Sequence, residues 1–470
     1  MISSFSAPFG RGRGAVRLAA GTLVSGLAAA GILATAGPAA AETVARTQGG
    51  ATATIGGLKT YGAAVLHGES GDQEVSAGLF EMSVEGGGTL QTYCVDLHNP
   101  TQKDAKYQET AWSGTSLGVN KDAGRIRWIL QNSYPQVNNL AALAKKADIA
   151  GGLTEQDAAA GTQVAIWRYS DGAAVEALDP QAERLADYLQ KAARAVAEPQ
   201  ASLTLDGAAV SGRPGELLGP VTVRTGASSV TVAPPLNSAT TGVRIVGKDG
   251  KPVTAAQDGS ELFFDVPADT AAGAAELTVQ ASTTVPVGRA FTSESRSQTQ
   301  ILAGSSESTV SATASATWAE TGPVPALSAA KNCTKNGLDL TAANQGDQVF
   351  TFELMGVQHS IPAGTSRTVT IPLQEDQAYD FAITGPQGTQ SRFTGVLDCR
   401  TRAAETDLTT QTLAEPSPAT VGGTASSGTD LAQTGGSDLT PLIAGTAIGL
   451  VVIGGTVLVL VGRKENDAQG

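Results

Sequence analysis

The segment "TYCVDLHNP", residues 92–100, places a thiol, a carboxylate and an imidazole on alternate residues. On a strand, Cys94, Asp96 and His98 would share one face, because successive side chains point to opposite faces. A cysteine nucleophile with His98 as base and Asp96 as orienting acid is one chemistry for such a set. Geometry opposes it, because residues four apart on an extended strand are about 13 Å apart at the backbone. A thiol and an imidazole at that distance would need a bend before Pro100 to form a hydrogen bond.

The chain has three cysteines, Cys94, Cys333 and Cys399. Cys333 and Cys399 stand near the two ends of a strand-rich unit of 76 residues, 326–401. In an oxidising compartment this spacing predicts a disulfide between them, which would stabilise the unit by roughly 4 kcal/mol in the entropic description. Cys94 is then the odd cysteine. In an exported protein it is intermolecular, buried and inert, or chemically used.

A second motif lies about 70 residues after Cys94, in "GTQVAIWRYSDG", residues 161–172. "YCVDL" followed at this distance by "TQVAIW" resembles the thioester domain of Gram-positive surface adhesins. The resemblance covers about the first third of the chain. It implies that the sulfur of Cys94 is joined to the side-chain carbonyl of Gln163, and that the fold brings the two residues together.

The residue types suit this chemistry. A thiolate that attacks an amide carbonyl expels ammonia and leaves an acyl–sulfur bond, which is an electrophile because sulfur is a good leaving group. The fold must hold the two groups in near-attack geometry and exclude water from the product. An amine on a target would then displace Cys94 and form a stable amide to Gln163. Because each molecule reacts once, we do not expect an enzyme.

Four neighbours of the pair have two interpretations each. Tyr93 and Trp167 would shield the thioester or pack in an ordinary core. Thr162 would hydrogen-bond the acyl carbonyl or cap a helix turn. Asp96 would orient or protonate nearby groups or be solvated.

The N-terminal segment predicts export. Arginines precede an apolar run, residues 18–33, which ends in small residues with Ala39 and Ala41 at the spacing that a signal peptidase reads. We expect a signal peptide over residues 1–41, with cleavage after Ala41.

The C-terminal segment predicts an anchor. Residues 439–462 carry no charge and are long enough to cross a bilayer as a helix, and the tail 463–470 begins with Arg463 and Lys464. Before them, a linker rich in Ser, Thr, Gly and Pro, 402–430, leads into "LAQTG", which resembles the sorting signal of actinobacterial sortases. By that resemblance a sortase cuts after Thr434 and joins it to peptidoglycan. The motif comprises Leu431, Ala432, Gln433, Thr434 and Gly435. The expected location is therefore the cell wall or cell surface, with the membrane involved only through this helix.

Composition limits the partners. A net charge of −13 argues against nucleic acid, which requires a basic face. The three histidines are scattered and no glycine-rich stretch resembles a phosphate-binding loop, so we expect neither a metal site nor a cofactor. The resemblance to thioester-domain adhesins implies the partner instead, an amine-bearing surface or matrix target.

The pattern along the chain predicts several domains. Residues 42–199 mix strands with helices: "EVSAGLFEMSV" and "LQTYCVDL" form a hairpin, Thr154 with Asp157 forms a capping box, and a helix opens at Pro180. Its apolar face comprises Ala182, Leu185, Ala186, Leu189 and Val196. Residues 200–321 carry short alternating strands typical of a β-sandwich, and residues 326–401 form a small β domain. The predicted fold is a multidomain chain in which an α+β thioester domain, a β-sandwich with a helical subdomain, precedes two all-β, Ig-like stalk domains.

Two functions remain open. One is a covalent adhesin. The other is a structural or non-covalent surface protein in which Cys94 is a buried small apolar residue. Isopeptide crosslinks in the stalk have little support, because Lys248 and Lys251 of the second domain lie at the turn "KDGK", where side chains are normally exposed.

Overall fold

A computed structural model of the chain describes residues 42–44, 49–69, 71–295 and 297–400. The predicted signal peptide, wall linker, sorting motif, membrane helix and tail lie outside these residues. Among the helices of the described part, none is both long and apolar enough to cross a bilayer.

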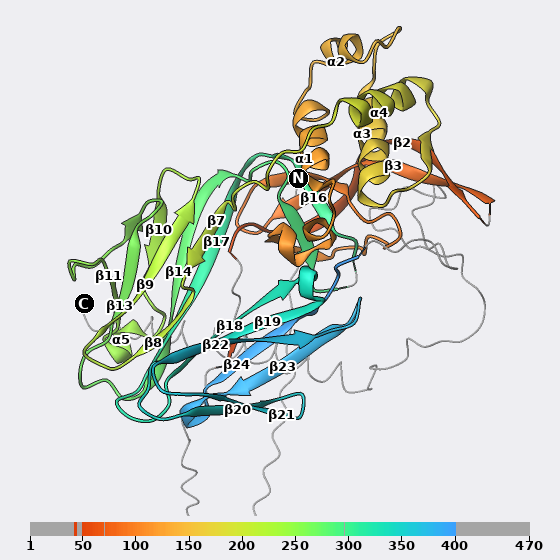
Figure 1. The fold of residues 1–470 in the computed structure, drawn as a ribbon. Coiled ribbons are helices and arrows are strands. Elements are labelled where there is room, and N and C mark those ends of the chain that lie inside the picture. Colours follow the sequence, from red (N-terminus) through yellow and green to blue (C-terminus); the bar gives the residue numbers. More distant parts are fainter. Residues whose placement is uncertain (1–41, 45–48, 70, 296, 401–470) are drawn as a thin grey trace, which may run out of the picture. The chain divides into compact units, whose positions relative to one another are not determined.

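A seven-stranded sheet carries the residues singled out above (Figure 1). Its strand order is β3-β4-β16-β15-β5-β2-β6, and β3 also pairs with β2, so the sheet closes on itself. The strands are β2 (Thr52–Gly68), β3 (Gly71–Val84), β4 (Thr89–Cys94), β5 (Lys106–Thr110), β6 (Val175–Ala177), β15 (Ala290–Ser293) and β16 (Gln300–Ser305).

The predicted hairpin is confirmed. It joins β3 to β4 with Phe80 opposite Thr92, and Gly86, Gly87 and Gly88 in its turn have positive φ angles of 84°, 118° and 107°. Residues without a Cβ adopt this backbone conformation at little cost.

Helices cover part of this sheet, and α3 packs against β2, β3 and α4 (Figure 1). The capping box is confirmed: Asp157 N donates to Thr154 Oγ1 at 3.1 Å, and Thr154 N donates to Asp157 Oδ2 at 2.9 Å. The helix that opens at Pro180 is also confirmed, although it ends before Val196. The elements are η1 (Trp112–Gly114), η2 (Ser116–Gly118), α1 (Ala123–Asn132), α2 (Leu140–Lys146), α3 (Glu155–Ser170) and α4 (Pro180–Ala192).

Two further sheets form the β-sandwich, with orders β12-β10-β14-β17-β8 and β11-β13-β9-β7. One short helix, α5 (Ser238–Thr241), connects β10 to β11. The strands are β7 (Leu203–Asp206), β8 (Ala209–Gly212), β9 (Leu217–Thr225), β10 (Val230–Ala233), β11 (Arg244–Val246), β12 (Ala255–Ala256), β13 (Glu261–Asp265), β14 (Gly273–Thr284) and β17 (Glu307–Trp318).

The sandwich differs from the predicted continuous domain 200–321. Between β14 and β17 the chain leaves the sandwich and adds β15 and β16 to the seven-stranded sheet. Every residue of β15 is buried, whereas buried positions alternate along β17. The sandwich is therefore inserted into the fold that carries Cys94.

The C-terminal β domain has three small sheets and a disulfide. Cys333 is bonded to Cys399, which confirms the predicted pair. Its sheets have the orders β18-β19-β22, β20-β21 and β1-β24-β23. The elements are β1 (Glu42–Val44), β18 (Pro325–Asn332), η3 (Cys333–Lys335), β19 (Gly337–Asn344), β20 (Phe350–Leu354), β21 (Val357–Ile361), β22 (Thr365–Pro372), β23 (Ala378–Thr384), η4 (Pro386–Gly388) and β24 (Gln390–Val396).

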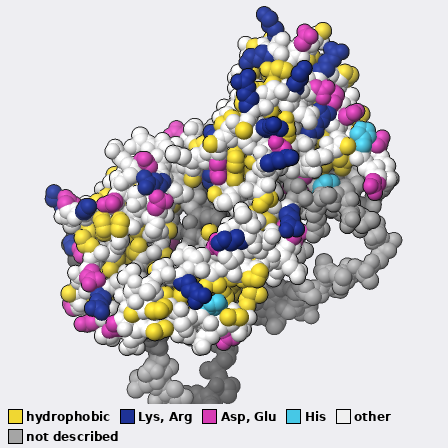
Figure 2. Space-filling model, in the orientation of Figure 1, with side chains coloured by type: hydrophobic (Ala, Val, Ile, Leu, Met, Phe, Trp, Pro, Cys, Tyr) yellow, Lys and Arg dark blue, Asp and Glu magenta, His cyan; other side chains and the backbone are white. Residues whose placement is uncertain are grey.

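Acidic and basic side chains lie intermixed on the face of the molecule in Figure 2. That distribution fits a solvated surface and gives no extended basic face of the kind that nucleic acid requires on the side shown.

Candidate functional site

Cys94 ends β4 in the interior of the fold, and its side chain has no solvent exposure. In the antiparallel register of β4 and β16, its Cα pairs with that of Gln300. The sulfur lies 2.5 Å from Oε1 of Gln298 and 3.4 Å from Nε2 of Gln300. Two side-chain amides therefore contact a buried thiol.

Gln163 reaches the same residue from α3, across 69 positions of sequence. Its Oε1 accepts a hydrogen bond from the backbone N of Cys94 at 3.0 Å, and its Nε2 donates to the backbone O of Cys94 at 2.9 Å. The prediction that the fold brings Cys94 and Gln163 together is therefore confirmed. Both of these hydrogen bonds join the Gln163 amide to the backbone of Cys94.

Gln298 and Gln300 were not singled out in the sequence. Both lie in "SQTQILAG", two residues apart, so their side chains share one face of an extended segment. Gln298 accepts from Thr101 Oγ1 at 2.6 Å and donates to the backbone O of Asp96 at 2.5 Å. Gln300 accepts from Thr92 Oγ1 at 3.0 Å and donates to Oε1 of Gln298 at 3.1 Å. The signal that could have identified them is two glutamines placed just before the apolar run "ILA".

Tyr93 and Trp167 are fully buried in the apolar core. Tyr93 donates its hydroxyl to the backbone O of Tyr134 at 2.9 Å. Trp167 lies one helical turn beyond Gln163, and its Nε1 has no hydrogen-bond partner among the described residues. Core packing describes both residues, and their role in shielding the sulfur stays a prediction.

Thr162 contributes to the helix rather than to the sulfur. Its hydroxyl donates to the backbone O of Ala158 at 2.6 Å, one turn back along α3. This bond satisfies the buried hydroxyl locally, as is common for threonine within helices.

Asp96 is buried, which excludes the solvated alternative. Its Oδ1 accepts from the backbone N of His98 at 3.3 Å, and its Oδ2 contacts Nδ2 of Asn99. Burial raises the pKa of Asp96 well above its ordinary value, and the carboxylates of Asp398 and Asp171 raise it further. The carboxyl of Asp96, two residues after the cysteine, therefore holds its proton more readily than an exposed carboxyl does.

Asp171, at the end of α3, supports the same loop. It accepts from the backbone N of Leu97 at 3.0 Å, and burial raises its pKa to about 7. Asp398 accepts from Thr299 Oγ1 at 3.2 Å, between the two glutamines, and burial raises its pKa to about 6. The C-terminal β domain thus contacts the strand that carries Gln300.

The structure does not place Asp96 as an orienting acid for the ring of His98. Asp96 accepts from the backbone N of His98 and not from its ring, whose Nδ1 is buried without a partner among the described residues. Burial lowers the pKa of His98, which favours the neutral imidazole.

One group of carboxylates has the spacing of metal ligands, with oxygens of Glu375, Asp376 and Asp398 within 4.8 Å of one another. Glu375 already accepts from the backbone N of Cys399 at 2.7 Å. The expectation of no metal and no cofactor stays a prediction.

Comparison with known proteins addresses the first part of the chain. Residues 91–196 match the family model described as thioester domain. This part of the chain is therefore similar to a thioester domain. No curated protein matches the chain. The matched range includes Cys94 and Gln163 and ends before β16, because the sandwich intervenes.

Two solved structures are similar to the chain. The Bacillus anthracis TIE protein is 16% identical over 74% of this chain and 64% of its own length, with a TM-score of 0.26. The thioester domain of the Enterococcus faecium TIE86 protein is 15% identical over 59% of this chain and 100% of its own length, with a TM-score of 0.27. The chain thus spans about two thirds of the Bacillus anthracis protein.

Proposed function

We propose that the chain is a cell-wall-anchored adhesin that binds amine-bearing targets covalently through an internal thioester of Cys94. The observation that carries the proposal is the contact of a fully buried sulfur with side-chain amides. A dry site preserves a thioester, because the bond hydrolyses in water. The match of residues 91–196 to the thioester domain supports the same chemistry.

Gln300 is our proposed acyl partner, in place of Gln163. Both ends of the Gln163 amide are bound to the backbone of Cys94, so it positions the strand end. Gln300 stands directly opposite Cys94, where side chains on paired strands have Cβ atoms about 5 Å apart. Gln298 also contacts the sulfur, but it precedes β16 and is not the residue paired with Cys94 in the strand register.

The reaction has two steps. The Cys94 sulfur attacks Cδ of Gln300, the carbon–nitrogen bond breaks, and the amide nitrogen leaves as ammonia with the thiol proton. The hydroxyl of Thr92 donates to the carbonyl oxygen of Gln300 and would stabilise the developing negative charge. A target amine then attacks the same carbon, the carbon–sulfur bond breaks, and Cys94 regains a proton. Each molecule reacts once, so the protein is not an enzyme in this proposal.

Intact mass tests the thioester. The mature chain should be lighter by one ammonia than its sequence requires, and methylamine should add without loss of further mass. Cys94→Ala should have its full mass and add nothing. A wild-type chain of full mass with a titratable thiol would refute the thioester and favour the alternative, a non-covalent surface protein with an inert cysteine.

Methionine substitutions identify the acyl partner, because methionine fills the space of glutamine without an amide to expel. Gln300→Met should abolish the loss of ammonia, while Gln163→Met and Gln298→Met should retain it in chains that remain folded by circular dichroism. Loss of the ammonia signal in Gln163→Met alone would instead support the assignment made from sequence.

The location rests on the sequence. The export signal, the LAQTG motif and the apolar segment 439–462 occur in the order that sorting requires. Thr434→Ala should move the protein from the wall fraction to the membrane fraction or the medium. Retention in the wall fraction would contradict sortase attachment to peptidoglycan.

A further inference from the structure

A pocket of about 490 Å³ lies beside the proposed thioester. One wall is formed by β5 and residues 292–295 of the seven-stranded sheet, and the opposite wall by the C-terminal β domain, including Lys331 and Tyr379. Its volume falls within the range of roughly 300–1,000 Å³ that is typical of small-molecule sites. The thioester chemistry proposed above does not use it.

Tyr107 links the pocket lining to the segment that carries Gln298. It lines the pocket, is buried, and its hydroxyl contacts Ser297 Oγ at 2.6 Å and the backbone O of Gln298 at 2.9 Å. Burial raises the pKa of its phenol, and Cys94 and Gln300 both lie near enough to affect that pKa. One phenol thus borders the pocket and also contacts the segment whose glutamines approach the sulfur.

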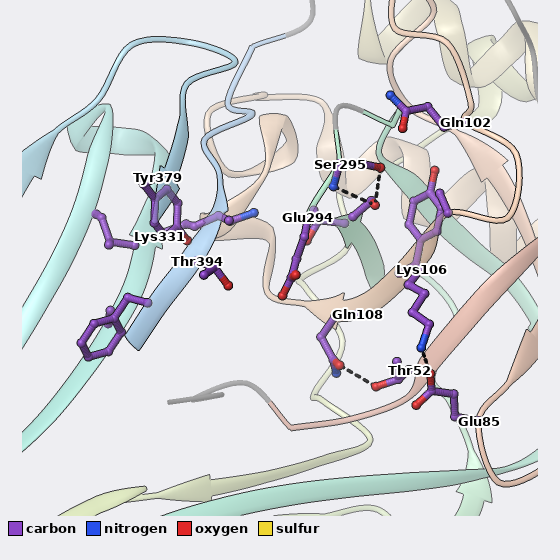
Figure 3. Close-up of a pocket in the computed structure, with 18 residues that line it drawn as sticks. Thr52, Glu85, Gln102, Lys106, Gln108, Glu294, Ser295, Lys331, Tyr379 and Thr394 are labelled. Atoms are coloured by element: carbon purple, nitrogen blue, oxygen red, sulfur yellow. Dashed lines mark hydrogen bonds and ion pairs between the residues drawn. The ribbon is translucent and has the colours of Figure 1, made fainter. Parts of the chain in front are cut away.

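The lining suits an alkyl chain that ends in an amine. Tyr379 and Phe393 present aromatic surface, and aromatic faces attract cations. Figure 3 shows the Lys331 amine pointing from β18 toward the segment that carries Glu294 and Ser295. Glu294 is exposed and supplies a carboxylate at this side of the pocket.

The pKa of Lys331 indicates how readily an amine in this pocket loses its proton. Burial lowers the pKa of its amine, although Asp398 and Glu294 act in the opposite direction. A second amine beside Lys331 would experience the same desolvation and would lose its proton more readily than in water. Only the neutral amine is a nucleophile, so this surrounding favours reaction.

We propose that this pocket binds the primary alkylamine of the target before it reacts, with Glu294 attracting the ammonium and Tyr107 controlling passage to the acyl group. The inference rests on the proposed thioester function. The alkylamine is a lysine side chain or a free diamine, which share the same chemistry.

Saturation kinetics test the pocket in the full mature chain. Intact mass follows adduct formation with methylamine, with cadaverine, and with a peptide that carries one lysine. The rate should reach a plateau with cadaverine or the peptide and stay linear with methylamine, which is too short to fill the pocket. A plateau with the peptide would identify a protein lysine as the source, and a plateau with cadaverine alone would identify a free diamine.

Two variants locate the binding. Thr394→Trp places a large ring on the lining and should slow the saturating amine about tenfold, with methylamine changed less than about twofold. Glu294→Gln should slow the saturating amine by about two- to fivefold, as expected for an exposed ion pair. Glu74→Gln, an exposed carboxylate on β3 outside the lining, is the matched control and should change neither rate.

The outcomes separate the two proposals. Linear kinetics with every amine, or equal rates for Glu294→Gln and Glu74→Gln, would overturn the pocket and leave the thioester intact. A wild-type chain that adds no amine would overturn the thioester and the pocket together. Because the side chain of Glu294 is exposed, its variant remains informative even if Thr394→Trp fails to fold.

Discussion

Replacing Gln163 should destabilise the fold even when no thioester can form. Its side chain satisfies the backbone N and O of Cys94, both in a part of the core without solvent exposure. A buried backbone group left without a partner costs about 1–3 kcal/mol, so Gln163→Ala should lower the free energy of unfolding by about 2–6 kcal/mol. Performing the substitution in Cys94→Ala removes any contribution from the thioester.

Urea unfolding, followed by tryptophan fluorescence, measures this change. Gln163→Met separates the lost hydrogen bonds from the space that alanine leaves empty. Methionine fills the space without forming either hydrogen bond, so this variant should retain most of the loss in free energy of unfolding. Gln136→Ala is the control: its exposed side chain donates one hydrogen bond, to Ala303 O at 2.9 Å, and water can replace it. We expect that control to cost about 1 kcal/mol or less. Equal losses for Gln163→Met and Gln136→Ala would refute the positioning role of Gln163.

Three further measurements address the elements that support the site. Glu109→Ala should cost about 3–5 kcal/mol in urea unfolding, because it leaves the buried Arg289, 2.9 Å away, without its most buried counterion. The free energy of unfolding should rise as the pH falls from about 7.5 to about 5. The folded pKa values of Asp171 (about 7) and Asp398 (about 6) exceed the unfolded values, so the folded state binds more protons in this range. A flat or opposite pH profile would contradict this prediction. Reducing the Cys333–Cys399 disulfide should cost about 4 kcal/mol, and an unchanged melting temperature would contradict its structural role.

Local elements were predictable from sequence because their signals are local. A capping box, a Pro at the first turn of a helix and a glycine-rich turn each act over a few residues, and Thr154, Pro180 and the β3–β4 turn behaved as predicted. The proximity of Cys94 and Gln163 followed from the resemblance of two motifs. Their roles did not, because a motif does not specify whether a side-chain amide contacts sulfur or backbone.

The placement of β15 and β16 was not predictable, because sequence signals are local and strand pairing is not. Strand pairing across about 200 residues depends on which edge of which sheet is open, and alternation within a strand contains no information about its partner. Gln298 and Gln300 were therefore assigned with the sandwich, although Gln300 pairs with Cys94.

The strands that carry the proposed thioester are connected directly to the sandwich and contact the C-terminal domain. The two sides of the proposed thioester lie on β4 and β16, and the chain enters β15 from β14 and leaves β16 into β17, two sandwich strands paired along their whole length. The buried Glu109–Arg289 pair joins β5 to the start of β15, and Asp398 of the C-terminal domain contacts Thr299. Movement of the sandwich or of the C-terminal domain would thus act on the strand that carries Gln300. In the proposed adhesin, a pull on either of these domains would therefore reach the strand that carries the acyl group.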